Sequence, residues 1–307
     1  MNSITVKSPA SVANLCCGFD IMGIALSGLY DVMKLTKRDE PGISIKHTDR
    51  YNLSENPSEN VAGVALQAMM DALKYTNGFD VVIDKQIKPG SGIGSSAASA
   101  TGIVVAANEL LGKPFGKKEL VSFAMEGEAL ASGSRHADNL APCIYGGLTL
   151  IRETSTLDII ELPIPPMYVN IIHPQIEIKT SYARQILPKE VPLKSAITQW
   201  ANVAGLIAGF IKSDYGLISR SLNDVIVEPV RSKLIPGFDQ VKKKSIEAGA
   251  LGGGIAGSGP SLFMFSENIS IAQAVEEEMK TVYQDLGIEY KTYITTIGEG
   301  IIVESLS

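Results

Sequence analysis

The sequence predicts an α+β protein of two lobes, and three observations support this prediction. The chain has 307 residues, which is long for a single hydrophobic core. Short β-branched segments alternate with long helical ones along it. A proline-rich stretch, LPIPPM at 162–167, interrupts this alternation near the middle, because proline cannot pair regularly in a sheet. We therefore expect one lobe over residues 1–162 and a second over residues 163–307.

The first lobe begins with strands and continues with helices. Alternating and β-branched residues predict strands over 3–10, 31–38, 42–48 and 79–87. Apolar residues at helical spacing predict helices over 60–75, 95–111 and 117–131. The helix over 95–111 is apolar on nearly all sides, so we expect it to be buried. A paired β segment is predicted over 144–151 and 155–164.

The second lobe mixes the same elements in a different order. A strand over 167–174 and helices over 195–211 and 239–250 precede two strands joined by a glycine turn within 250–266. An amphipathic helix over 269–287 and strands within 289–305 follow. The last elements run helix–strand–strand–helix–strand, which predicts a ferredoxin-like α+β sandwich.

Composition excludes several classes of protein. Hydrophobic residues make up 45 % of the chain and the net charge is −6, which is ordinary for a globular protein. The largest run of basic residues is KKK at 242–244, which we interpret as the solvated face of a helix. Because binding to a nucleic-acid backbone needs a basic surface, we expect no nucleic-acid partner.

Cysteine and histidine are too few for two other classes. Cys16, Cys17 and Cys143 make a disulfide framework implausible, and their spacing with the three histidines does not suggest a zinc site. The first fifteen residues lack the layout of a signal peptide, and no apolar stretch reaches the length that spans a membrane. We expect a cytoplasmic protein with no membrane partner.

The segment PGSGIGSSAASA at 89–100 carries the strongest functional signal. Glycines at 90, 92 and 94 allow positive φ and a close approach of backbone amides to a ligand. Ser95 or Ser96 is a natural N-cap for the helix that follows. The amides of the turn and the positive end of this helix would converge on one place, which predicts an anion site. The alternative is a plain turn capped by serine.

A second glycine-rich segment requires a different interpretation. Gly252, Gly254 and Gly257 match the GxGxxG pattern of dinucleotide-binding folds. In those folds the pattern follows a strand and opens a helix. Here a helix precedes it, a strand follows it, and Pro260 stands where helix amides would be needed. The pattern therefore does not indicate a dehydrogenase, and a phosphate-binding loop of the GxxxxGK[ST] type is absent from the sequence.

Three segments in this order resemble the motifs of the GHMP small-molecule kinases: PASVANLCCGFDIMG (9–23), PGSGIGSSAASA (89–100) and GGGIAGSGPSLFMF (252–265). Within that superfamily, GEALASGSRHADNLAPCIYGG (127–147), KTSYARQILP (179–188) and EPVRSKLIPGF (228–238) are most similar to the homoserine kinase family. One departure is Cys16-Cys17, where the family has small residues or proline, and we expect it to change only loop packing.

The resemblance implies a fold and a reaction. The fold would combine an N-terminal lobe like ribosomal protein S5 with the C-terminal ferredoxin-like lobe, and the protein would form a homodimer. The reaction would be ATP-dependent phosphorylation of L-homoserine to O-phospho-L-homoserine for threonine synthesis. The alternatives are another small anionic alcohol as substrate, or a nucleotide-binding sensor without catalysis.

The resemblance also assigns the nucleotide and metal sites. ATP would contact both glycine turns, through Pro89, Gly90, Ser91, Gly92, Ile93, Gly94, Ser95, Ser96, Gly257, Ser258 and Gly259. Mg²⁺, which prefers hard oxygen ligands, would be held by Ser96 (or Ser95) and Glu128. The alternatives are an exposed helix carboxylate for Glu128 and a tight strand connection for the second turn.

An amino-acid substrate needs partners for its carboxylate and its ammonium. Arg184 and Arg231 would clamp the carboxylate, because a guanidinium fork matches it bidentately. Asn14 and Asp20 would hold the ammonium. The resemblance adds further substrate contacts at His136, Asn139 and Thr180. The alternatives are ion pairs for the arginines and a loop-capping carboxylate for Asp20.

The motif HADN at 136–139 bears on the mechanism. In related kinases an aspartate in this region is taken as the base, and here the place is held by Asn139. An amide cannot usefully accept a proton, so Asn139 would orient the substrate hydroxyl, making it catalytic together with Ser96 and Glu128. The hypothesis is direct attack on the Mg-bound γ-phosphate through a loose transition state. His136 and Asp138 are the rival bases.

Overall fold

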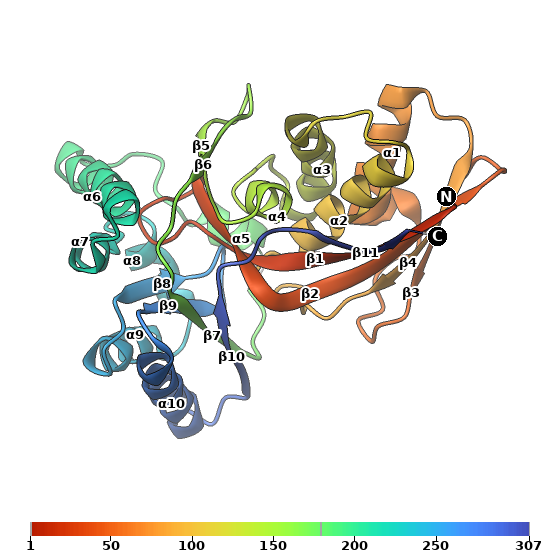
Figure 1. Ribbon diagram of the computed structural model, residues 1–307. Coiled ribbons are helices and arrows are strands. Elements are labelled where there is room, and N and C mark those ends of the chain that lie inside the picture. The colour runs from red at the N-terminus through yellow and green to blue at the C-terminus, as the bar shows by residue number, and fades with distance from the viewer. Residues whose placement is uncertain (1, 179, 307) are drawn as a thin grey trace.

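The computed structural model describes residues 2–178 and 180–306, with the side chains of Thr180, Ser305 and Leu306 left out. Two sheets lie side by side, and helices cover the outer face of each (Figure 1). This confirms the predicted two-lobed α+β class.

The first lobe is built on a seven-stranded sheet. Its strands are β1 (Ser3–Ala13), β2 (Met22–Arg38), β3 (Gly42–His47), β4 (Gly78–Asp84), β5 (Leu148–Glu153), β6 (Asp158–Leu162) and β11 (Ile302–Leu306). Helices α1 (Val61–Leu73), α2 (Ser95–Leu110), α3 (Lys117–Ser132) and α4 (Leu140–Tyr145) and the short 3₁₀ turn η1 (Pro57–Glu59) complete the lobe. The main path of the sheet runs β11-β1-β2-β4-β3, and β5 and β6 extend it from β2.

Helix α2 is buried, as the sequence predicts, and lies at the centre of this lobe. Small residues on almost all its sides, among them Ala97, Ala100 and Ala107, are fully buried against strands and neighbouring helices. Because small side chains let backbones approach closely, the helix can pass beneath α1 and α3 and still contact β1 and β2. This position directs its N-terminus towards the second lobe.

The second lobe is built on a four-stranded antiparallel sheet in the order β10-β7-β9-β8. Its strands are β7 (Tyr168–Pro174), β8 (Gly252–Ile255), β9 (Leu262–Ser266) and β10 (Tyr290–Thr296). Its helices are α5 (Thr180–Gln185), α6 (Leu193–Lys212), α7 (Tyr215–Ser221), α8 (Glu228–Arg231), α9 (Phe238–Glu247) and α10 (Ile269–Asp285), with the 3₁₀ turn η2 (Ser232–Leu234). The succession β7, α9, β8, β9, α10, β10 is the β-α-β-β-α-β order of a ferredoxin-like sandwich.

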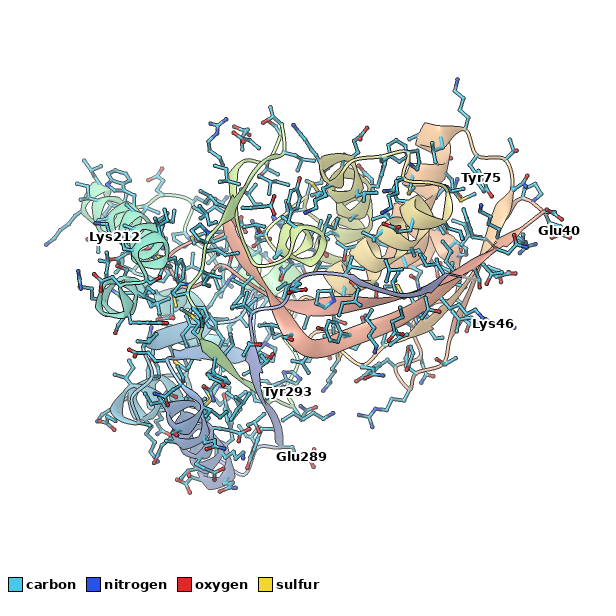
Figure 2. The ribbon with its side chains drawn as sticks, in the orientation of Figure 1. Glu40, Lys46, Tyr75, Lys212, Glu289 and Tyr293 are labelled. Carbon is cyan, nitrogen blue, oxygen red and sulfur yellow. The ribbon has the colours of Figure 1, made fainter. Side chains whose placement is uncertain are left out.

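One hydrophobic cluster joins the two lobes. It combines residues of β1 and β2, such as Val12 and Ile24, with residues of the second sheet, such as Ile171 and Phe263. Tyr293 on β10, labelled in Figure 2, packs against the same cluster. The lobes therefore share a core, and the groups between them are held in fixed relative positions.

The structure differs from the predicted elements most clearly at two places. The last strand, β11, was expected in the second lobe, but it pairs antiparallel with β1 of the first. The sequence of a short strand does not indicate its partner strand, because pairing depends on which sheet edge is free in the folded protein. Ile144 and Tyr145 were expected in a strand and instead end helix α4, which a proline at its third position helps to start.

Candidate active site

A cavity of about 320 Å³ lies between the lobes, and most of the residues predicted for the site line it. From the first lobe these are Asn14, Asp20, Pro89, Gly90, Gly92, Gly94, Ser95, Ser96, Glu128, His136 and Asn139. From the second lobe they are Arg184, Arg231, Gly257 and Ser258. Segments from the whole length of the chain thus meet at one place.

Three residues predicted to contact ATP do not line the cavity. Ile93 is buried in the shared core, and its carbonyl accepts a hydrogen bond from the Ser11 amide. Ser91 and Gly259 lie behind the two glycine turns, where Ser91 accepts bonds from Ser261 and Gly259 begins the bend at Pro260. They shape the two turns, and their predicted contact with ATP stays a prediction. The side chain of Thr180, a predicted substrate contact, is outside the described residues.

The first glycine turn has the backbone that its sequence predicts. Gly90, Gly92 and Gly94 have φ of 72°, 85° and 71°, a left-handed region open to glycine. The predicted serine cap is wrong, because Gly94 is the N-cap of α2 and no described side chain bonds to the first amides. The positive end of this buried helix is therefore left for a ligand at the cavity.

The two serines after the turn point in different directions. Ser95 Oγ donates to the carbonyl of Ile87 at 2.8 Å and so ties the helix to the strand before it. Ser96 Oγ donates to Glu128 Oε2, also at 2.8 Å. The geometry thus pairs the carboxylate of α3 with Ser96.

Glu128 is buried on α3, which rules out the alternative of an exposed helix carboxylate. Burial raises the pKa of Glu128 to about 7, although the bond from Ser96 acts in the opposite direction. Asp138 is also buried, and burial, together with the charges of Asp20 and Glu128, raises the pKa of Asp138 to about 7. A nearby cation would favour the ionised form of both groups.

The second glycine turn packs backbone to backbone against the first. A Cβ on Gly92 would lie 2.6 Å from the carbonyl oxygen of Gly259, and one on Gly257 would lie 2.8 Å from that of Gly92. Only glycine fits at such distances. The carbonyl of Gly257 accepts from Asn14 Nδ2 at 2.7 Å and from Arg231 Nη1 at 3.2 Å. All three predicted motifs thus meet at this turn.

Sequence reasoning missed Lys85, a buried cation in the cavity wall. Its ammonium pairs with Asp31 and donates to the Ser95 carbonyl and to Ser99 Oγ, both at 2.8 Å. A lysine at the end of a strand, four residues before a glycine turn, is the signal that could have found it. Because Asp31 neutralises this ammonium, Lys85 fixes the start of α2 through its hydrogen bonds and adds no net charge there.

Asp20 and Arg184 form a two-pronged ion pair across the cavity. Arg184 Nη1 and Nη2 lie 3.0 and 2.7 Å from the two carboxylate oxygens of Asp20. Asp20 adopts a left-handed φ of 62°, and its amide donates to Asn14 Oδ1. His136 Nδ1 lies 3.4 Å from Arg184 Nη2, and burial lowers the pKa of His136. The lowered pKa and the adjacent guanidinium of Arg184 make His136 a weak base.

Arg231 completes this charged end of the cavity. It is buried on α8, and its Nε donates to the Ala183 carbonyl at 2.9 Å. Burial and the neighbouring Arg184 lower the pKa of Arg231 to about 10, so it remains charged at neutral pH. The ring of Phe19, which sequence reasoning also missed, lies about 5 Å from both guanidinium carbons (5.0 and 5.3 Å).

Asn139 is the N-cap of α4 and lines the cavity. Its Oδ1 accepts from Ser11 Oγ at 2.8 Å, which leaves its amide nitrogen as the end available to a ligand. Asp138, the rival base, accepts the Asn139 backbone amide at 3.1 Å. The cavity therefore combines three groups. The turn at 89–94 and the start of α2 form an anion cradle, Glu128 and Asp138 are two carboxylates, and Asp20 with Arg184 and Arg231 has charges that match a zwitterion.

Comparison with known proteins agrees with this arrangement. Models of the GHMP kinases N-terminal domain and of the GHMP kinases C-terminal domain match residues 60–147 and 206–285, so fold and site together define a small-molecule kinase of the GHMP class. A homoserine kinase from Chlorobium phaeobacteroides is 44 % identical over 93 % of this chain and 93 % of its own length. One from Methanocella arvoryzae is 40 % identical over 98 % of this chain and 97 % of its own length. The chain belongs to the homoserine kinase family.

Solved structures give the same result. The crystal structure of homoserine kinase from Cytophaga hutchinsonii superposes with a TM-score of 0.95 at 43 % identity, covering 99 % of this chain and 98 % of the other. The L. major mevalonate kinase reaches a TM-score of 0.74 at 16 % identity, covering 95 % and 94 %, and shares the fold alone.

Proposed function

We propose that the protein transfers the γ-phosphoryl group of ATP to the side-chain hydroxyl of L-homoserine and releases O-phospho-L-homoserine and ADP. One observation carries this proposal: the anion cradle at the start of α2 shares a single cavity with the Asp20–Arg184–Arg231 cluster. Phosphates fit the first and an amino-acid zwitterion fits the second. Family membership supports the choice of homoserine.

ATP would lie with its phosphates along the turn at 89–94 and its base towards the far end of the cavity. Leu53, Val61 and Ala131 also line the cavity and would offer apolar surface to the adenine ring. The amides of the turn and the N-terminus of α2 would stabilise the phosphate charge. Gly257 and Ser258 would cover the phosphates from the second lobe.

Ser96 and Glu128 fit a Mg²⁺ ion by the chemistry of their donors. Their oxygens lie 2.8 Å apart at the cavity wall, and Mg²⁺ in kinases takes few protein ligands and fills its shell with phosphate oxygens and water. When bound there, the ion would withdraw electron density from the phosphate that is transferred. Among the described residues, no cluster of three His, Cys, Asp or Glu side chains could hold a metal by itself.

Substrate binding would exchange one ion pair for two. In the structure Arg184 is neutralised by Asp20. The zwitterion of homoserine would insert its ammonium against Asp20 and Asn14 and its carboxylate against Arg184 and Arg231. A ligand with only one of these charges leaves a half-buried partner unpaired, which costs free energy. This site favours amino acids over neutral alcohols.

The chemistry would need little more than positioning. The amide of Asn139 holds the substrate hydroxyl in line with the γ-phosphorus, the new P–O bond forms as the bond to ADP breaks, and the hydroxyl proton passes to the transferred phosphoryl group. A loose transition state develops little charge on the attacking oxygen, so no strong base is needed.

We further propose that the protein is a cytoplasmic homodimer. Its three cysteines are free and buried, which suits a reducing compartment. Helix α6 exposes Leu193, Ile197, Trp200 and Ile211, and its residues 195–211 include no charged side chain. A second copy packed antiparallel on this face would cover the apolar row.

A coupled ADP-release assay with ATP and Mg²⁺ tests the reaction. L-Homoserine should be turned over strongly and selectively against mevalonate, galactose, L-threonine and L-serine. Equal rates with a neutral alcohol would contradict the role of the charged cluster. Nucleotide binding with no turnover of any of these alcohols would leave the kinase fold but refute the substrate.

A further inference from the structure

His173 is a buried histidine on a central strand of the second sheet that the proposed chemistry does not use. Only 2 % of its surface is exposed. It follows Ile172, which pairs with Leu262 at the start of β9, so it lies opposite Ser261. Ser261 comes directly after Pro260, at the end of the second glycine turn. The histidine thus lies directly behind that turn.

A chain of hydrogen bonds runs from His173 to the phosphate turn of the other lobe. His173 Nδ1 lies 3.1 Å from Ser261 Oγ, and Ser261 Oγ lies 2.5 Å from the carbonyl oxygen of Ser91. The backbone amide of Ser261 donates to the same oxygen at 3.2 Å. The second lobe therefore holds one carbonyl of the phosphate turn with two donors.

The direction of this chain follows from the donors available. A hydroxyl has one hydrogen, so when Ser261 donates to Ser91 it must accept from His173 Nδ1–H. His173 Nε2 is buried and has no partner among the described residues, as expected for the unprotonated nitrogen of a neutral ring. Burial, and then Lys88 and Lys291, lower the pKa of His173 to about 4, which keeps the ring neutral.

We propose that His173 and Ser261 are positioning residues that hold the phosphate turn in its binding conformation from the second lobe. A trans peptide is planar, so the Ser91 carbonyl and the Gly92 amide point in opposite directions. With the carbonyl held at Ser261, the Gly92 amide is turned the other way, and Gly92 lines the cavity. The inference rests on the proposed function, because it assumes that this cavity binds nucleotide phosphates.

Ser261→Ala and Ser266→Ala form a matched pair for the test. Both serines are buried on or beside β9, and Ser266 Oγ donates to Asn170 of β7 at 2.9 Å, at the opposite end of the strand. Both changes remove one hydroxyl bond between the same two strands. Calorimetric titration with MgADP and KM for ATP should show at least tenfold weaker nucleotide binding in S261A only, with an unchanged KM for homoserine.

Variants of His173 test whether it acts through Ser261. H173N keeps a donor near the position of Nδ1 and should retain nucleotide affinity, whereas H173L should lose it. The double variant S261A/H173L should bind nucleotide no worse than S261A, because the histidine has no other route to the turn. Circular dichroism and thermal melting would first confirm that each variant is folded. If S261A does not fold, the comparison of nucleotide affinity between H173N and H173L still tests the inference.

Two results would overturn the inference alone: equal nucleotide affinity of S261A and S266A, or additive losses in the double variant. A wild-type protein that binds no MgADP would refute the proposed function, and the inference with it. A wild-type protein that binds MgADP but does not phosphorylate homoserine refutes the substrate only, since the comparison of affinities needs no second substrate.

Discussion

Single residues in this protein have environments that their sequence neighbours do not reveal. Glu128 lies on a helix whose other acids, Glu119 and Glu126, are at least partly exposed, yet it is buried against Ser96. Asp20 and Arg184 are 164 positions apart and form one ion pair. At this scale, function depends on charges that are held in place before any ligand arrives.

The raised pKa of Glu128 predicts a stability that depends on pH. The fold favours the neutral carboxyl, so this stabilisation is complete below the unfolded pKa near 4.5 and is lost as pH rises through about 7. Glu128→Gln, which is always neutral, should therefore unfold at a higher urea concentration than wild type at pH 8. We expect a difference on the order of 3 kcal/mol, shrinking towards pH 5.

The measurement is urea unfolding in a chelator, since a bound cation would favour the ionised wild-type carboxylate. Glu126→Gln is the control, because Glu126 is on the same helix but its side chain is 40 % exposed. E128Q should at the same time lose kinase activity. Equal stability of E128Q and wild type at pH 8 would show that the fold does not raise the pKa of Glu128.

Asn139 is predicted to orient the substrate hydroxyl. Asn139→Leu should lower kcat by roughly a hundredfold, since misplacing a reacting group costs about this much. Its affinity for nucleotide should change by less than about threefold, because the proposed partner of Asn139 is the substrate hydroxyl and not the nucleotide. Steady-state kinetics and calorimetry give the two values. His136→Gln is the companion variant and should keep most activity; near-normal turnover in N139L would exclude the orienting role.

At the scale of elements, the two glycine turns act as one unit. Their backbones approach so closely that a Cβ on Gly92 or Gly257 would meet a carbonyl oxygen of the other turn. The turns belong to different lobes and to different sequence motifs. Because of this contact, the backbone amides at the start of α2 face the second glycine turn, which belongs to the other lobe.

Gly257→Ala tests this contact. Gly147→Ala is the control, because Gly147 has a similar left-handed φ but no such contact. Gly257 has φ of 56° and Gly147 has φ of 60°, but no described atom lies within 4 Å of a Cβ on Gly147. Both substitutions should cost about 1 kcal/mol of stability from the left-handed conformation, and G257A should cost more because its Cβ would lie 2.8 Å from the Gly92 carbonyl oxygen. Only G257A should raise the KM for ATP, on the order of tenfold, which is about 1.4 kcal/mol of binding.

Thermal melting and initial-rate kinetics on both variants make the comparison. A KM for ATP that rises equally in G147A would mean that strain and not the contact between turns is responsible.

At the scale of the whole molecule, the lobes share a core, and one surface stands apart from the rest. The row of exposed apolar side chains on α6 includes Trp200, the protein's only tryptophan, which is 56 % exposed. Lys212, labelled in Figure 2, ends this helix at the edge of the molecule. Within residues 2–178 and 180–306, no helix has the length and apolarity to cross a membrane.

Ile197→Glu should convert the proposed dimer into monomers, because a charge buried at an apolar interface is costly. Sedimentation equilibrium gives the mass directly, and the emission of Trp200 should shift to longer wavelength as it becomes exposed. Ile246→Glu is the control: Ile246 is 50 % exposed against 49 % for Ile197, but it lies on α9, away from this row. A wild-type monomer, or a dimer that survives I197E, would contradict the assignment of this face.

The sequence by itself predicted the two-lobed class, nearly all of the longer helices and strands, and the residues that gather at the cavity. These features rest on local information: apolar periodicity, glycine where φ must be positive, and motifs that remain intact in the chain. It failed where the answer depends on distant partners. The pairing of β11 with β1, the buried Lys85 and the N-cap of α2 at Gly94 are examples.

Tertiary structure alone decided which predicted residues face the cavity and which support it from behind. Ser91 and Gly92 are neighbours in one motif. The carbonyl of Ser91 is held by Ser261, whereas Gly92 lines the cavity. A local pattern constrains the backbone of its own segment, but the orientation of a peptide and the burial of a charge are set by atoms that only folding brings near.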